Sequence, residues 1–229
     1  MISGENLLPS CVGFIMDGNR RFAKEIGRTE LEGYQAGKEK FLEVAEWVAE
    51  KKIPHAVFYA FSTENWKREK EEVEHLMFLL REFLEQFRKE ADERKLNAKI
   101  IGRREDLPGD IQASIKSLEE SGQDKYTTTI WVAISYGGRV EILSAINEAI
   151  AQGESVDEEQ FSKLLWTDGM PDPDIIIRTS GEKRLSNFLP WQTVYSELFF
   201  LDNYWPSFTK DEFTRILDEY GKRERRVGR

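Results

Sequence analysis

The sequence is poor in cysteine and histidine, and this excludes two common kinds of site. A single cysteine, Cys11, rules out a disulfide within the chain and fits a reducing compartment. Its apolar neighbours are typical of a small core residue. The two histidines, His55 and His75, are too few and too isolated to indicate a zinc site.

Long apolar runs are missing as well. No stretch approaches the roughly 18 apolar residues that a membrane-spanning helix needs. The first residues also lack the basic and then apolar pattern of a signal peptide. We therefore expect a cytoplasmic protein.

Basic residues do not dominate the composition. The chain has 33 Lys and Arg against 42 Asp and Glu, a net charge of −9 at pH 7. This balance argues against a nucleic-acid partner and makes any local group of arginines more informative. The length of 229 residues suits one α/β domain. We expect a single domain over 1–229, with a loose lead-in over 1–10 and a basic tail over 222–229.

Apolar segments with strand-like and helix-like spacing alternate along the chain. The strands are expected at residues 12–16, 55–61, 97–102, 126–135, 174–178 and 194–201. The helices are expected at 33–52, 71–95, 108–121 and 157–166, with one more ending near 152 and a last one from 210. This order predicts an α/β fold with a mostly parallel central sheet of about six strands flanked by helices.

A first polar group follows the first expected strand. Asp17-Gly18-Asn19 reads as a tight turn, and Arg20 and Arg21 then open a helical pattern. Helix N-termini and paired arginines are typical of phosphate sites. An acid beside a phosphate is repulsive unless a cation lies between them, so Asp17 is a candidate Mg²⁺ ligand. The alternative is an ordinary turn followed by a helix cap.

Two further polar segments also follow expected strands. Residues 62–68 come after the second strand, and ligands of open α/β sheets bind beyond the carboxyl ends of strands. Residues 178–186 contain Arg178, Arg184 and Ser186, a combination that fits a second phosphate group. The alternative for this later segment is a solvated surface loop.

Two other features admit two interpretations each. Glu197 lies in the apolar segment 194–201, where a buried carboxylate needs a partner. That partner is either a metal ion or a structural salt bridge. The broad apolar stripe of 71–95 either packs against the sheet or lines a groove for a lipid.

Five stretches taken together resemble one known family. They are 15–23 (IMDGNRRFA), 59–66 (YAFSTENW), 136–139 (YGGR), 177–188 (IRTSGEKRLSNF) and 223–226 (RERR), and they occur in the family's order. The chain resembles the cis-prenyltransferases of the undecaprenyl diphosphate synthase group from about residue 11 to residue 228. Five ordered matches make a specific signal, whereas any one alone is weak.

The resemblance implies a reaction and its partners. An allylic diphosphate, commonly farnesyl diphosphate, condenses repeatedly with isopentenyl diphosphate to give a long polyprenyl diphosphate such as undecaprenyl diphosphate. It also implies Mg²⁺, a homodimer, an apolar product tunnel and a peripheral membrane contact for product release. An alternative is a non-catalytic partner subunit of a heteromeric prenyltransferase.

The resemblance also assigns roles to individual residues. It implies that Asp17 holds Mg²⁺ and assists departure of the allylic diphosphate, and that Asn65 helps remove a proton through water. Glu197 would complete the Mg²⁺ environment. The allylic diphosphate site would comprise Gly18, Asn19, Arg20, Arg21, Phe22, Ser62, Thr63, Glu64, Trp66 and Arg68. The isopentenyl diphosphate site would comprise Arg178, Arg184, Leu185 and Ser186.

The chain departs from the family pattern at positions near the first site. Cys11 stands where a histidine is usual, Glu30 where an arginine is usual and Tyr34 where another histidine is usual. The last two positions help to bind the allylic diphosphate in relatives. An acid at Glu30 would replace an attraction by a repulsion, and each charge-assisted hydrogen bond contributes about 1.5–3 kcal/mol. The sequence therefore predicts weaker binding of the allylic substrate if Glu30 keeps that location.

Overall fold

A six-stranded parallel sheet forms the centre of the computed structural model, which describes residues 8–94, 96–120, 126–153 and 155–223. The strand order is β3-β4-β2-β1-β5-β6. The strands are β1 (Cys11–Ile15), β2 (His55–Ser62), β3 (Leu96–Ile101), β4 (Thr128–Tyr136), β5 (Ile175–Arg178) and β6 (Glu197–Phe200). The prediction of an α/β fold with about six parallel strands is confirmed.

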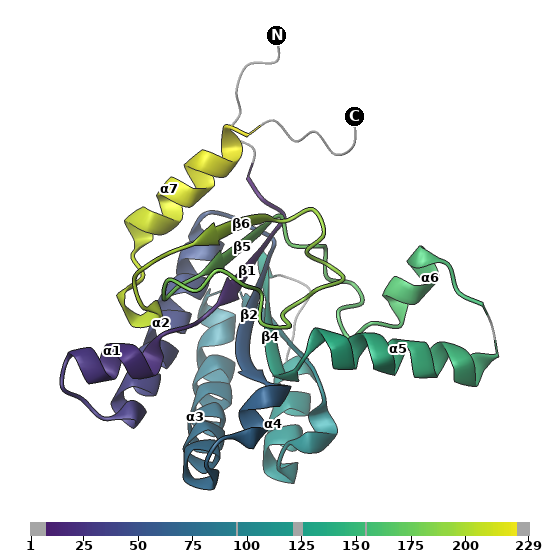
Figure 1. Cartoon of the computed structure of the whole chain (residues 1–229), viewed down its shortest axis with the longest axis horizontal. Coiled ribbons are helices and arrows are strands. Elements are labelled where there is room, and N and C mark those ends of the chain that lie inside the picture. Colours follow the sequence, from purple (N-terminus) through teal and green to yellow (C-terminus); the bar gives the residue numbers. More distant parts are fainter. Residues whose placement is uncertain (1–7, 95, 121–125, 154, 224–229) are drawn as a thin grey trace.

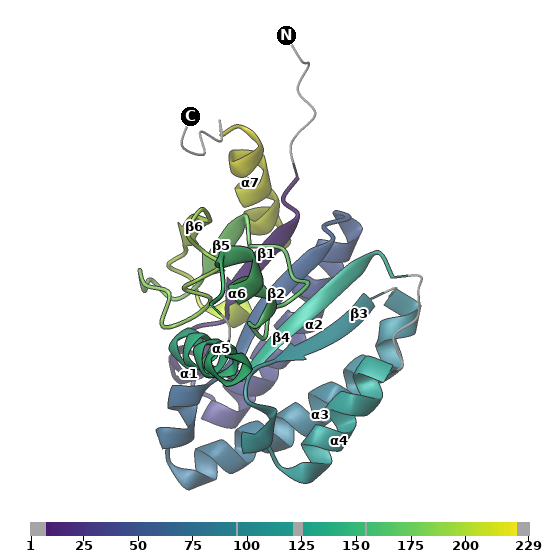
Figure 2. The same ribbon diagram turned by 90° about the vertical axis from the view of Figure 1, so that its right-hand side faces the viewer.

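Helices cover both faces of this sheet (Figures 1 and 2). One face packs on α2 (Glu30–Glu50), α3 (Lys70–Arg94), α4 (Gly109–Glu120) and α7 (Lys210–Gly221). On the other side lie α5 (Gly138–Gln152) and α6 (Glu158–Lys163), as Figure 2 shows. The short helix α1 (Asn19–Glu25) follows β1 directly.

The strands are apolar on both of their faces. Val12 and Phe14 of β1 enter the larger core under α2 and α3, whereas Cys11 and Ile15 enter a smaller core on the opposite face. Alternate residues of a strand point to opposite faces, so a strand covered on both sides is apolar throughout. This burial explains why the expected strands read as continuous apolar runs.

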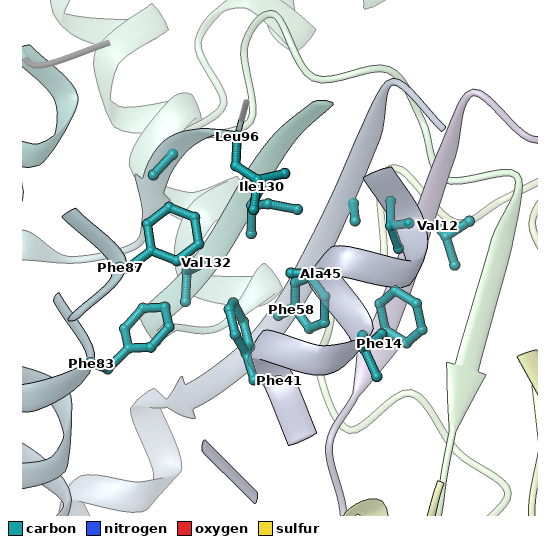
Figure 3. Close-up of a cluster of buried hydrophobic side chains, with 14 of the residues drawn as sticks. Val12, Phe14, Phe41, Ala45, Phe58, Phe83, Phe87, Leu96, Ile130 and Val132 are labelled. Atoms are coloured by element: carbon teal, nitrogen blue, oxygen red, sulfur yellow. The ribbon is translucent and has the colours of Figure 1, made fainter. Parts of the chain in front are cut away.

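Aromatic rings fill the larger core, as Figure 3 shows. Phe41 of α2 lies with its ring centroid 4.2 Å from that of Phe58 and 4.7 Å from that of Phe83 of α3. Phe58 of β2 in turn stacks on Phe14 of β1 at 4.7 Å. Buried aromatic pairs of this kind add stability beyond the area they bury. They hold α2 and α3 at a defined spacing over the centre of the sheet.

Most predicted elements lie within a few residues of their expected bounds, and the last strand differs most. The apolar segment 194–201 suggests eight strand residues, but β6 has only four, Glu197–Phe200. Backbone hydrogen bonds from Thr193 to Leu189 and from Ser196 to Thr193 fold the preceding residues into turns. Turn formation, which depends on distant packing, overrides the local strand pattern.

The topology places a crevice at the carboxyl ends of β1 and β5. From β1 the chain builds the sheet toward β2, β4 and β3, and then crosses to the other side of β1 to add β5 and β6. Open α/β sheets bind ligands where the direction of strand addition reverses in this way. Ile15 pairs in register with Arg178, so the residues that follow β1 and those that end β5 meet at this point.

Candidate active site

Asp17 follows β1, and hydrogen bonds to its main-chain carbonyl hold it in place. Its carbonyl oxygen accepts hydrogen bonds from the Thr179 hydroxyl at 2.7 Å and from the Trp205 N–H at 3.0 Å. The next residue, Gly18, has φ = 106°, and a Cβ there would lie 2.7 Å from the Tyr204 ring. Only glycine fits both this conformation and this space. The tight turn predicted from Asp17-Gly18-Asn19 is therefore present for two physical reasons.

The Asp17 carboxylate lies between two arginines from distant parts of the chain. Oδ2 accepts from Arg178 Nη2 at 2.8 Å, and Oδ1 accepts from Arg21 Nη2 at 3.2 Å. The Arg178 side chain is only 4% exposed, and that of Asp17 is 28% exposed. A buried guanidinium requires such a partner, because an unpaired buried charge is costly.

Arg178 also organises the loop that follows β5. Its Nη1 donates to the Arg184 carbonyl at 2.5 Å and to the Ser186 hydroxyl at 2.7 Å. Four residues of the segment that follows β5 have positive φ without being glycine, namely Ser180, Ser186, Asn187 and Leu189. Backbone conformations of this kind cost free energy and persist where surrounding contacts impose them, as at functional sites. The solvated-loop alternative for 178–186 is thereby disfavoured.

Asn65 enters the site from η1 (Thr63–Lys67), the short 3₁₀ helix after β2. Its Oδ1 accepts from the backbone N–H of Ser62 at 3.0 Å. This bond fixes the orientation of the amide, so Nδ2 is the group left to donate to a ligand or water. Asn65 can therefore position a water molecule through Nδ2, whereas an amide is too weak a base to take a proton itself.

These groups meet at one polar pocket of about 260 Å³. Its lining comprises Ile15, Met16, Asp17, Asn19, Tyr34, Tyr59, Ala60, Ser62, Asn65, Arg68, Leu76, Arg178 and Ser186. An apolar pocket of about 120 Å³ lies beside it, lined mainly by side chains of α2, α3 and β2. Met16, Asn19, Tyr34, Ala60 and Leu76 line both. A polar compartment thus adjoins an apolar one at a shared wall.

At this shared wall a hydrogen-bonded group joins α1, α2 and the start of α3. Glu72 of α3 accepts from the Tyr34 hydroxyl at 2.6 Å and from Arg68 Nη1 at 2.7 Å, and pairs with Arg20 at 3.5 Å. Burial raises the pKa of Tyr34 well above its usual value, and its bond to Glu72 adds to the shift. Tyr34 therefore stays a neutral donor. Glu30, by contrast, is an exposed first residue of α2 and does not line the pocket.

Several predicted site residues lie beside the pocket rather than in it. The Trp66 indole N–H donates to Ser135 at 2.9 Å, behind the pocket wall. Thr63 donates to Glu64, and Glu64 accepts from Asn187 at 3.1 Å, so both face the 178–189 loop. The predicted site residues that line neither pocket are Gly18, Arg20, Arg21, Phe22, Thr63, Glu64, Trp66, Arg184, Leu185 and Glu197.

The structure corrects the prediction that Glu197 completes the Mg²⁺ environment around Asp17. It begins β6 in register with Ile175, three residues before Arg178 and thus about 10 Å toward the amino ends of the strands. Asp17 lies beyond the opposite ends, so Glu197 cannot share a metal ion with Asp17 within one chain. Its carboxylate instead pairs with Arg223. The salt-bridge alternative describes Glu197 correctly.

Of the two predicted metal ligands of one chain, only Asp17 lines the polar pocket. Over the described ranges, no group of three or more His, Cys, Asp or Glu side chains could hold a metal ion. A single carboxylate still suits Mg²⁺, which commonly combines one or two carboxylates with phosphate oxygens and water. The donor set fits that ion only when a diphosphate supplies further oxygens.

Sequence reasoning assigned no role to several residues that the structure places at the site, among them Tyr59, Thr179 and Glu72. Tyr59 lines the pocket and donates to the carbonyls of Tyr136 at 3.2 Å and Ser186 at 3.4 Å. Thr179 donates a hydrogen bond to the Asp17 carbonyl, and Glu72 accepts hydrogen bonds from Arg20 and Arg68. Tyr59 opens the family stretch 59–66, which gave it no role, and Glu72 lies in an acidic helix start that carries no local signal. Thr179 directly follows Arg178, which was the signal available for it.

A buried carboxyl lies near the site without belonging to it. Glu141 of α5 is fully buried and accepts from the Tyr136 hydroxyl at 2.5 Å and from Gln192 Nε2 at 3.1 Å. Both partners are neutral, and burial raises the pKa of Glu141 above its usual value. Its Oε1 has no hydrogen-bond partner.

We expect Glu141 to make stability depend on pH. The folded state keeps a proton that the unfolded chain loses near the ordinary carboxyl pKa of 4.5, so stability falls as pH rises from there to the raised folded pKa. Glu141→Gln removes this term. Urea unfolding of the wild type and of Glu141→Gln from pH 4.5 to 8 gives the free energy of unfolding as a function of pH. The wild type should lose stability more steeply as pH rises, and equal slopes for the two proteins would contradict this role of Glu141.

Comparison with known proteins agrees with this arrangement. A family model described as "Putative undecaprenyl diphosphate synthase" matches residues 15–228. The chain belongs to this family. Membership makes the protein a prenyltransferase of the undecaprenyl diphosphate synthase type, as the resemblance implied. No helix of the described ranges is long and apolar enough to cross a bilayer.

Relatives in the family are similar over nearly the whole chain. An isoprenyl transferase of Thermotoga maritima is 42% identical over 226 residues, which are 96% of this chain and 97% of that protein. A tritrans,polycis-undecaprenyl-diphosphate synthase (geranylgeranyl-diphosphate specific) of Thermoplasma volcanium is 46% identical over 232 residues, 96% of this chain and 89% of that protein.

The fold is also that of solved family structures. Lavandulyl diphosphate synthase from Lavandula x intermedia, in complex with dimethylallyl diphosphate, matches with a TM-score of 0.91 and 31% identity. The match covers 97% of this chain and 99% of that one. The single-domain arrangement of one parallel sheet between helices is therefore shared.

Proposed function

We propose that this protein condenses isopentenyl diphosphate onto an allylic diphosphate, repeatedly and with cis geometry, to give a polyprenyl diphosphate. Farnesyl diphosphate is the starter that the family resemblance favours. Geranylgeranyl diphosphate is the alternative starter, because the Thermoplasma relative is named as specific for it. Isopentenyl diphosphate and the allylic diphosphate are the two substrates in either case.

The observation that carries the proposal is the contact between the two pockets. A reactant with a charged head and an apolar tail needs a polar compartment that opens into an apolar one. Asp17, Arg178 and Asn65 lie in or at the first, and the stripe of α3 lines the second. A volume of about 120 Å³ is small for a prenyl chain, since ligand pockets usually span roughly 300–1,000 Å³. We therefore propose that α2 and α3 separate to admit a longer prenyl chain.

The chain's cations supply the electrostatic part of the reaction. Breaking the allylic C–O bond leaves a negative diphosphate and an allylic carbocation. Arg20, Arg21 and Arg68 are proposed to bind the allylic diphosphate, and Arg178 with Arg184 the isopentenyl diphosphate. Fixed charges aimed at a developing anion stabilise the transition state, commonly by a factor of about 10²–10³ for one group.

Mg²⁺ is the proposed cofactor, with Asp17 as its protein ligand. When bound, the ion would neutralise diphosphate oxygens and favour departure of the leaving group. Asp17 is oriented for this role by Thr179 and Trp205, which hold its carbonyl oxygen. Asn65 is proposed to orient the water that accepts the proton lost after condensation, because its amide is held by Ser62 and is too weak a base to accept that proton itself.

The function is tested with the purified chain alone. Radiolabelled isopentenyl diphosphate is incubated with Mg²⁺ and dimethylallyl, geranyl, farnesyl or geranylgeranyl diphosphate, and products are resolved by chain length. We expect elongation with the C15 or C20 starter and none in the presence of a chelator. An inactive chain that becomes active only with a second, different subunit would support the non-catalytic alternative instead.

We also propose that the protein is a homodimer. Leu143, Ile146 and Ile150 form an exposed apolar stripe on α5, with 58, 39 and 70% of their surfaces accessible. Val194 and Tyr195, ahead of the edge strand β6, are 70 and 69% exposed. Apolar patches of this kind commonly mark contact with another protein.

Leu143→Glu should convert the dimer to a monomer, because it places a charge in the proposed apolar interface. The measurement is light scattering coupled to size-exclusion chromatography. Gln152→Glu, on the opposite side of α5, is the matched control and should remain dimeric. A wild-type monomer, or a Leu143→Glu dimer, would be evidence against this interface.

A further inference from the structure

Glu182 lies between arginines that belong to the two proposed diphosphate sites. One of its oxygens pairs with Arg21 Nη1 at 3.6 Å, and the other accepts from Arg184 Nη1. Arg21 follows β1 and Arg184 follows β5. One carboxylate thus neutralises a cation of each site.

The three side chains are accessible enough to exchange partners. Arg21 is 45%, Arg184 59% and Glu182 34% exposed, in contrast to the buried Arg178. Exposed ion pairs contribute little to stability and form and break readily. Arg21 also keeps contacts to Asp17 and to the Ser180 carbonyl, so it stays in place when Glu182 leaves.

We propose that Glu182 is a resident anion that holds Arg21 and Arg184 in the unliganded enzyme and competes with diphosphate for them. This inference rests on the proposed function. A diphosphate carries several charges and displaces the single carboxylate when it binds. After each condensation, Glu182 returns to the arginines and promotes release of the pyrophosphate product. Glu182 is a positioning residue and takes no part in bond making.

Removing the negative charge of Glu182 is expected to tighten the binding of pyrophosphate. Glu182→Gln keeps the size of the side chain but abolishes its competition for the arginines and its repulsion of the ligand. Calorimetric titration with inorganic pyrophosphate and Mg²⁺ should give a dissociation constant about three- to tenfold lower than that of the wild type. Pyrophosphate should also inhibit the variant more strongly during turnover.

Glu50→Gln is the matched control, because Glu50 pairs with Lys210 at the surface and the substitution changes net charge equally. It should leave pyrophosphate affinity unchanged. Glu182→Ala should tighten binding as Glu182→Gln does, which keeps the test valid if either variant folds poorly. A purely structural role for Glu182 would not produce tighter binding.

Two outcomes overturn the proposal and differ from each other. If the wild type binds pyrophosphate and both Glu182 variants bind it equally or more weakly, Glu182 is not a competitor, and the proposed function stands. If the wild type itself binds no pyrophosphate with Mg²⁺ present, the diphosphate sites are wrongly assigned, and the proposed function fails together with this inference.

Discussion

Asp17→Asn is expected to lower the rate of prenyl transfer by about 10²–10³-fold while the protein remains folded. The amide keeps an oxygen that accepts from Arg178, but it loses the negative charge proposed to hold Mg²⁺. Asn is a better choice than Ala because the Arg178 side chain is only 4% exposed. Removing its partner altogether would leave a buried charge unpaired and confuse catalysis with stability.

The measurement is incorporation of isopentenyl diphosphate under saturating substrates, over a range of Mg²⁺ concentrations. Far-UV circular dichroism and urea unfolding serve as the check on folding. Turnover by Asp17→Asn at the wild-type rate, with the same Mg²⁺ dependence, would show that the proposed metal role is wrong.

Arg178→Met is expected to cause the largest loss of stability, about 3–5 kcal/mol, together with loss of activity. The guanidinium joins Asp17 to the Arg184 carbonyl and the Ser186 hydroxyl, so its removal releases a loop held in strained backbone conformations. Arg21 would be the remaining arginine bound to Asp17. Equilibrium urea unfolding, followed by circular dichroism, measures this change.

Arg184→Ala is the matched control for that experiment. Its side chain is 59% exposed and pairs with Glu182, so the free energy of unfolding should change by less than about 0.5 kcal/mol. The variant should nevertheless raise KM for isopentenyl diphosphate, because Arg184 is proposed to bind it. If both substitutions lowered the free energy of unfolding equally, burial of Arg178 would not explain its contribution to stability.

The general location of the site follows from the sequence. Asp17 and Ser62 follow expected strands and Arg178 ends one, and parallel strands present their carboxyl ends at one edge. The strand register confirms that the carboxyl ends of β1 and β5 lie side by side, because Ile15 pairs with Arg178. The loop geometry around Gly18 was predictable for the same local reasons, since glycine is needed where the backbone turns sharply.

The errors have one physical origin, namely that sequence pattern does not specify register or direction of side chains. Glu197 appeared to be buried in a strand near the metal, but it starts β6 at the far end of the sheet. Trp66 lies two positions from Arg68, yet its indole bonds to Ser135 behind the pocket. Glu182 and Glu72 gave no local sign that they neutralise the arginines of the site.

The sequence by itself determined the fold class, the family and the three strand ends that carry the chemistry. These depend on periodicity, on turn-forming residues and on motifs, which are local properties of the chain. Only the tertiary structure decided which charges meet: Asp17 with Arg178, Glu182 between Arg21 and Arg184, and Glu197 with Arg223. Ion pairs join residues up to 161 positions apart, and their partners follow from strand order and register.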